Sequence, residues 1–103
     1  MAEARDTATH ALGDNAVRVR IVQALEHYRA KGHRIETRWD NPSQCSVKVF
    51  LTPMTKLDGT ITLAPGRINF LVTYPGVFDK IGGRAQIAEY LATFRAEVAK
   101  WLR

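Results

Sequence analysis

Few residues of this sequence could do chemistry, and they are widely spaced. There is one cysteine, Cys45, and there are three histidines, at positions 10, 27 and 33. A metal ion needs three or four converging ligands, and no pair of these residues has the spacing of a metal motif. We therefore expect no metal ion and no cofactor.

Nucleophilic catalysis would require Cys45 or a serine beside a histidine. Cys45 falls on the side of an alternating segment that we expect to face inward, where a cysteine acts as a small apolar side chain. Ser43 and Ser46 lie in or next to a turn, and no nucleophile-elbow motif surrounds them. We interpret all three as structural.

Acid–base catalysis and phosphate binding each have one weak candidate. Glu36 and Asp40 could form a carboxylate pair, but they alternate with arginines, which is typical of a solvated charged face. The run Gly82-Gly83-Arg84 could offer backbone N–H groups and a cation to a phosphate, yet it lacks the P-loop pattern. The sequence therefore predicts that the protein is not an enzyme, and it indicates no small-molecule substrate.

The positive charge is the most informative chemical feature. Fifteen basic side chains against ten acidic ones give a net charge of +5. Six of the basic residues fall within residues 17–38, against two acidic ones. Such a concentration attracts polyanions and acidic proteins, although a modest positive charge can also serve solubility alone.

The candidate interaction surface comes from period-two alternation in two neighbouring segments. Between residues 33 and 40, apolar side chains alternate with charged ones, and residues 45–52 repeat the pattern. The expected outer face then carries cations and two large apolar groups, with Glu36 and Asp40 diluting the positive charge. These candidates are Arg34, Arg38, Lys48, Phe50 and Leu71. If the strands align, Phe50 and Leu71 could meet in a small exposed patch, which favours contact with protein.

A second set of cations lies on a predicted helix. Arg18, Arg20 and Lys31 flank its apolar stripe, where they could contact a polyanion or lay their stems over the core. Together with the cations and Phe50 of the sheet they would suit single-stranded nucleic acid, which is held by charge and by stacking.

These residues require a framework of two helices and a sheet. Hydrophobic periodicity predicts an α+β domain of two layers: an N-terminal helix, an antiparallel β-meander of three to four strands, and a C-terminal helix. The expected bounds are a helix over 14–31, strands over 33–40, 45–52, 60–64 and 67–74, and a helix that begins at Asp79 or is delayed to Arg84. Asp14 or Asn15 would cap the first helix, Gly32 would end it, and Asp58-Gly59 would form a hairpin turn.

Length and composition set the remaining expectations. The chain has 103 residues, 46% hydrophobic and 24% charged, which suits one globular domain. We expect a mobile arm over residues 1–13 and a single domain over 14–103. A lone cysteine and the lack of a secretory signal or an apolar run long enough for a span favour the cytoplasm and no membrane contact. Abundant arginine and alanine hint at a bacterial genome.

The sequence thus favours a small non-enzymatic intracellular protein-interaction module that forms a homodimer. Its partner would be another protein or a second copy, bound through a sheet face or the terminal helix. The alternative is a nucleic-acid-binding domain that uses the basic helix edge and the cationic sheet face.

Overall fold

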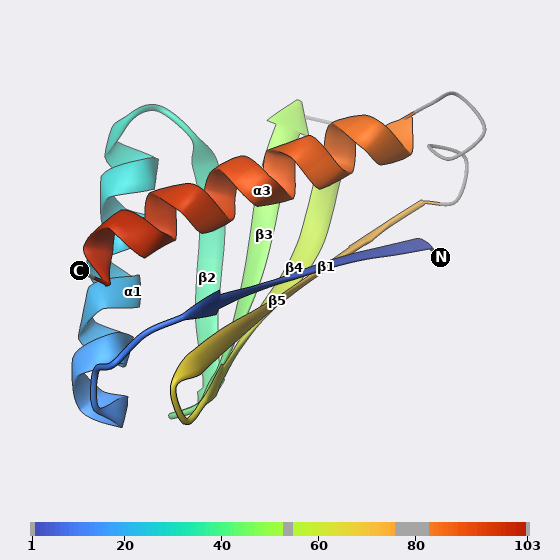
Figure 1. The fold of residues 1–103 in the computed structure, drawn as a ribbon. Coiled ribbons are helices and arrows are strands. Elements are labelled where there is room, and N and C mark those ends of the chain that lie inside the picture. The colour runs from blue at the N-terminus through green and yellow to red at the C-terminus, as the bar shows by residue number, and fades with distance from the viewer. Residues whose placement is uncertain (1, 53–54, 76–82, 103) are drawn as a thin grey trace.

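The computed structural model describes residues 2–52, 55–75 and 83–102. One antiparallel sheet carries two helices (Figure 1). The elements, in chain order, are β1 (Ala2–Thr9), α1 (Asp14–Ala30), β2 (Arg34–Asn41), β3 (Gln44–Thr52), β4 (Thr55–Ala64), β5 (Arg67–Tyr74) and α3 (Gly83–Trp101). The α+β class is therefore confirmed.

The sheet has five strands in the order β1-β5-β4-β3-β2. Strands β2 to β5 form the expected meander, in which each strand pairs with the next one along the chain. Strand β1 adds to the far edge, in register from Ala2 opposite Tyr74 to Thr9 opposite Arg67. The architecture thus differs from a meander of three to four strands that follows an N-terminal helix.

Strand β1 replaces most of the mobile arm expected over residues 1–13. Its inward positions are Ala4, Asp6 and Ala8, which lie opposite Val72, Phe70 and Ile68 of β5. Alanine and aspartate have low strand propensity and little apolar surface, so alternation alone could not reveal this strand. Its position is fixed by pairing with β5 and by contact with α3.

Strand β4 corrects the predicted turn at Asp58-Gly59. The strand runs unbroken through both residues, and Gly59 lies opposite Val47 on one side and Val72 on the other. A hairpin of the expected type needs positive φ, and among the described glycines only Gly32 and Gly66 have it. The short strand expected over 60–64 is in fact ten residues long.

The core lies between the inner face of the sheet and both helices. Buried side chains of α1 and α3 join inward side chains of the strands in one cluster, which includes Ile21, Ile35, Phe70 and Val98. Cys45 belongs to it with 0% exposure, as the alternation predicts. The apolar stripes of both helices therefore have the same task, which is to cover this one face.

The ends of α1 match the prediction in part. Gly32 follows the helix with φ +96, a conformation in which glycine is favoured. At the other end the N-cap is Gly13, without a side-chain hydrogen bond, so neither Asp14 nor Asn15 caps the helix. The Asp79 cap expected for the last helix lies outside the described residues.

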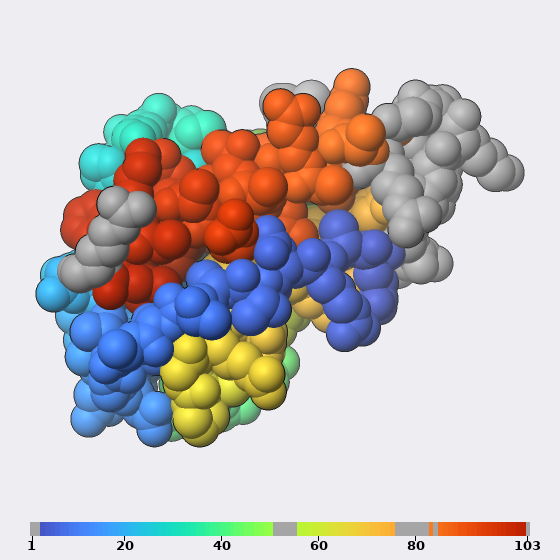
Figure 2. Space-filling view, viewed as in Figure 1, coloured from blue at the N-terminus to red at the C-terminus, as the bar shows by residue number. Residues whose placement is uncertain are grey.

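Helix α3 closes the β1 edge of the molecule. Figure 2 shows the helix lying against the strand along much of its length. Arg95 Nε donates a 2.8 Å hydrogen bond to Asp6 Oδ2, which links the two elements. No helix in the described part of the chain is long and apolar enough to cross a membrane.

Candidate functional site

The outer face of the sheet is the largest candidate surface. Both helices bury their apolar stripes against the inner face, so no described helix covers the outer one (Figure 1). Along β2 the exposure alternates as the sequence predicts, with Arg34, Glu36 and Arg38 exposed and Ile35 buried. The register of the strands then determines which outward side chains are neighbours.

Charges of opposite sign alternate across the middle of this face. Glu36 lies opposite Lys48, and Lys48 lies opposite Asp58 on its other side. All three side chains are exposed, and no ion pair within 4.0 Å joins them. Each charge is therefore available to a partner. Because the signs alternate, this row of the face is neither uniformly positive nor uniformly negative.

A basic corner lies at the start of β2. The guanidinium carbon of Arg34 lies 4.6 Å from the centre of the Phe50 ring, a cation–π contact. Phe50 pairs with Arg34 on one side and with Lys56 on the other, and Lys48 follows two residues away along β3. We call Arg34, Lys48, Phe50 and Lys56 the basic corner. Sequence reasoning missed Lys56, because it lies in a segment that we expected to be a loop.

Leu71 lies apart from this corner. Phe50 lies four residues along β3 from Ser46. Ser46 is in register with Thr60 of β4, and Thr60 is in register with Leu71 of β5. At the usual spacing of residues and strands, roughly 16 Å separates the two apolar groups. The joint patch of Phe50 and Leu71 that alignment of the strands could have produced does not form.

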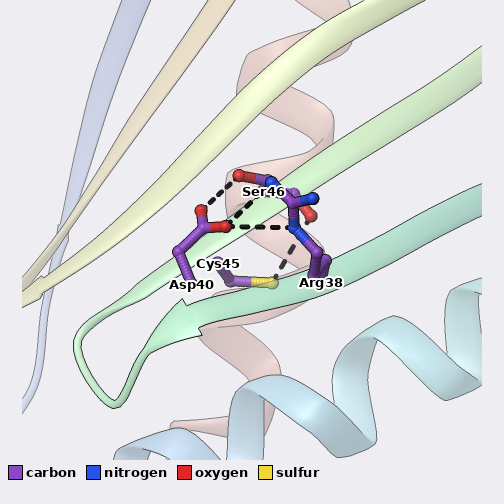
Figure 3. A network of polar contacts seen from close by, with 4 residues as sticks. All are labelled: Arg38, Asp40, Cys45 and Ser46. Carbon is purple, nitrogen blue, oxygen red and sulfur yellow. Dashed lines mark hydrogen bonds and ion pairs between the residues drawn. The ribbon is translucent and has the colours of Figure 1, made fainter.

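Arg38 belongs to a polar network at the β2–β3 turn (Figure 3). Its guanidinium lies 3.0 Å from Asp40 Oδ1, and the Ser46 hydroxyl donates to Asp40 Oδ2 at 2.5 Å. The bond from Ser46 is the main cause that lowers the pKa of Asp40, with the charge of Arg38 adding to it. The side chain of Arg38 is 81% exposed, so it can still reach a second carboxylate.

The candidate cations of α1 lie on the other side of the sheet from the basic corner, because α1 packs against the inner face. Lys31 lies 3.7 Å from Glu97 of α3, which neutralises its charge. Arg18 and Arg20 are exposed and form no ion pair within the described part of the chain. The structure thus separates the two sets of cations that the nucleic-acid alternative combined.

A cleft of about 410 Å³ between the end of α1 and α3 is a feature that sequence reasoning missed. The Tyr28 hydroxyl donates to the Tyr90 hydroxyl at 2.9 Å, and the His33 ring stacks on Tyr28 with 3.9 Å between centroids. Burial, and then the bond with Tyr28, raises the pKa of Tyr90. The cleft brings together residues of α3 with the end of α1 and the connection that follows it, and no sequence motif marks such a meeting.

Several polar groups of the cleft are paired with one another. The Tyr28 and Tyr90 hydroxyls bond each other, and Glu97 is already paired with Lys31 and Lys100. No hydrogen bond between His33 and a carboxylate is found among the described residues, so no group there orients the imidazole as a base. The described residues also contain no cluster of three or more metal-ligating side chains.

A small apolar cavity lies between α3 and the sheet. Its volume is about 40 Å³, and its lining includes Val47, Leu57, Tyr90 and Phe94. Burial raises the pKa of the Cys45 thiol, so this side chain is a protonated core residue rather than a nucleophile at neutral pH.

Comparison with known proteins yields fold relatives only. No family model and no curated protein matches the chain. TTHA0849 from Thermus thermophilus is 12% identical, with a TM-score of 0.50 over 96% of this chain and 98% of that one. The di-domain ARO/CYC protein BexL of the BE-7585A biosynthetic pathway is 14% identical, with a TM-score of 0.56. The match covers 99% of this chain and 50% of BexL. At these identities the likeness shows the fold alone.

Proposed function

We propose that this protein is a non-enzymatic protein-interaction module of the cytoplasm, that it forms a homodimer, and that it binds a further protein through the outer face of its sheet. The observation that carries this proposal is the uncovered outer face with its basic corner. A face of a sheet that no other element covers is free to contact a partner. The cations of the corner form no ion pair with another described residue, which favours a partner with an acidic segment.

The arrangement of charge favours a protein partner over nucleic acid. Lys48 has a carboxylate on each side, at Glu36 and Asp58. A phosphate backbone that follows this row would therefore be repelled by two negative charges. A protein surface can match alternating signs, whereas a uniform polyanion cannot. The free cations of α1, Arg18 and Arg20, face away from this row and could not contact the same strand of nucleic acid.

The interior supports a binding role rather than catalysis. The likeness to BexL, which is named as an ARO/CYC protein, would favour an enzyme. However, ligand pockets have volumes of roughly 300–1,000 Å³. The cavity between α3 and the sheet has about 40 Å³ and is apolar. In the larger cleft beside His33, the Tyr28 and Tyr90 hydroxyls are bonded to each other.

The test compares charge reversals on the two sides of the sheet. Lys48→Glu and Lys56→Glu change the basic corner, whereas Arg20→Glu makes the same change in charge on exposed α1. Tagged variants are used to capture proteins from the native cell, and the captured proteins are quantified by mass spectrometry. We expect the corner variants to lose a specific protein by about tenfold or more, the effect of roughly 1.4 kcal/mol, and Arg20→Glu to retain it.

Two outcomes would contradict the proposal. Equal capture by all variants would show that the outer face is not the binding surface. The second outcome concerns a mixed-sequence single-stranded nucleic acid. If it binds tightly, loses affinity steeply with salt and responds to Lys48→Glu, the alternative function would replace this one.

A further inference from the structure

Strand β2 is a free edge of the sheet. It is eight residues long, and in the sheet it pairs only with β3. Free edges of this length are sites where a second chain can add a strand. The outward side chains of this strand, Arg34, Glu36 and Arg38, are exposed, so its outer face is accessible.

The backbone groups that point away from β3 can be assigned. The Ile35 carbonyl accepts a 3.3 Å hydrogen bond from Arg29 Nε, which places it on the side away from β3. In an antiparallel pair, alternate residues direct both backbone groups to the same side. Thr37 and Trp39 therefore also present N–H and C=O groups at the free edge. No side chain or turn among the described residues bonds to the backbone of these two.

The outward side chains of β2 are complementary to themselves. In chain order they read Arg34, Glu36, Arg38, Asp40. When this strand lies antiparallel to a second copy with Thr37 opposite Thr37, Arg34 faces Asp40 of the second copy and Glu36 faces its Arg38. All four cross-strand pairs then join opposite charges. Pairs of this kind stabilise a sheet by roughly 0.2–1 kcal/mol each.

The neighbouring registers are repulsive, which makes this pairing specific. If the strand is shifted so that Glu36 is the central residue, Glu36 faces Glu36 and Arg34 faces Arg38. If Arg38 is central, Arg38 faces Arg38 and Glu36 faces Asp40. The register centred on Thr37 uses the backbone groups that point away from β3 and forms four pairs of opposite charge. The registers centred on Ile35 or Trp39 use the same backbone groups but form only two such pairs.

Apolar groups next to the edge agree with this arrangement. In the same register Ile35 faces Trp39 of the second copy, and the ring of Trp39 is only half-buried in one chain. Val22 is 41% exposed and lies two turns before Arg29, on the flank of α1 that reaches the edge. A second chain along β2 would approach both side chains.

We propose that two copies of this chain pair edge to edge through β2, antiparallel and centred on Thr37, to form a continuous ten-stranded sheet. This inference rests on the homodimer of the proposed function and names its interface. The other edge strand, β1, offers less, because α3 packs along it and Arg95 of that helix bonds Asp6.

The test uses single charge reversals and their mixture. Glu36→Arg and Arg38→Glu each convert two attractive pairs per dimer into repulsive ones. We expect the dissociation constant of each variant to rise at least about tenfold, so that sedimentation at tens of micromolar shows one 11.6 kDa chain. A 1:1 mixture of the two variants restores opposite charges at both positions, and we expect it to sediment as a heterodimer. The double variant Glu36→Arg/Arg38→Glu should dimerise by itself.

Glu3→Arg is the matched control, because it reverses an outward carboxylate on the other edge strand and should leave the dimer intact. Far-UV circular dichroism shows that each variant is folded. If the unmodified chain is a dimer but the mixture stays monomeric, this interface is wrong while the homodimer stands. If the unmodified chain is a monomer at these concentrations, both the homodimer and the β2 interface are wrong. Binding of another protein through Lys48 is measured separately and is unaffected by either result.

Discussion

At the scale of single residues, the hydroxyl pair of Tyr28 and Tyr90 links α1 to α3. The bond is 2.9 Å long and half-buried, so each hydroxyl depends on the other for a partner. We expect Tyr90→Phe to lower the free energy of unfolding by about 1 kcal/mol, the usual net value of such a bond. Tyr28→Phe should lower the free energy of unfolding by about the same amount, and the double variant should lower it little more than either single variant. Denaturant unfolding of all four proteins measures this, and strictly additive losses would show that the bond contributes nothing.

The Asp40 carboxylate gives a prediction about acid. Its pKa lies below the ordinary 3.8, mainly because Ser46 donates to it. A carboxyl whose pKa is lowered by folding stabilises the folded state above the unfolded pKa, and this contribution is lost as the pH falls through the lower folded value. Ser46→Ala should therefore raise the pKa of Asp40 and reduce its contribution above pH 4. An NMR titration of the carboxyl carbon tests this. Ser43→Ala is the control, since the Ser43 hydroxyl does not contact Asp40. An unchanged Asp40 pKa in Ser46→Ala would refute the prediction.

At the scale of elements, β1 is held to α3 by the ion pair of Asp6 and Arg95. Both side chains are about one third exposed, so the pair is worth only about 0.5–1 kcal/mol. We expect Asp6→Asn to speed amide hydrogen exchange along β1 several-fold while β3 is unaffected. Glu3→Gln, which breaks an exposed pair within the same strand, should leave exchange unchanged. Uniform acceleration in all strands would mean that the pair supports the whole fold rather than this edge.

Two glycines of the β4–β5 hairpin should respond in opposite directions to alanine. A Cβ on Gly59 would meet the Leu71 carbonyl oxygen at 3.4 Å and that of Val47 at 3.7 Å, which are ordinary contacts. Gly59→Ala should therefore stabilise the folded protein by about 0.5–1 kcal/mol, because alanine leaves the unfolded chain fewer conformations than glycine does. Gly66 has φ +75, and alanine there should cost about 1 kcal/mol or more. Thermal unfolding compares the two, and a destabilised Gly59→Ala would show that the strand needs glycine.

How well each element could be predicted depended on its apolar residues. Strand β5 and helix α1 carry large apolar side chains at regular spacing, and their predicted bounds agree with the structure within a residue. Strand β1 faces the core with alanines and an aspartate, so nothing local distinguished it from an arm. In β4 the dipeptide Asp58-Gly59 resembled a turn, although Leu57 and Ile61 on either side maintain the alternation. Pairing with β3 and β5 overrode the turn preference.

At the scale of the whole molecule, one sheet separates a face that both helices cover from a face that no described helix covers. Alternation along β2 and β3 correctly predicted that Arg34, Arg38 and Lys48 are exposed. Their neighbours depend on register, which alternation does not determine, so the separation of Phe50 and Leu71 and the contribution of Lys56 emerged only from the fold. The cleft beside Tyr90 was beyond sequence reasoning because two segments far apart in the chain, residues 28–33 and 86–97, build it.

The central claim is that the outer face contacts a protein in the cell. A photoreactive side chain placed at Lys48, and in a second protein at Arg20 as the control, tests it most directly, because cross-linking records contact in the intact cell. The account predicts a discrete protein adduct from position 48 that is absent from position 20. Adducts of equal yield from both positions, or adducts to nucleic acid alone from position 48, would contradict it.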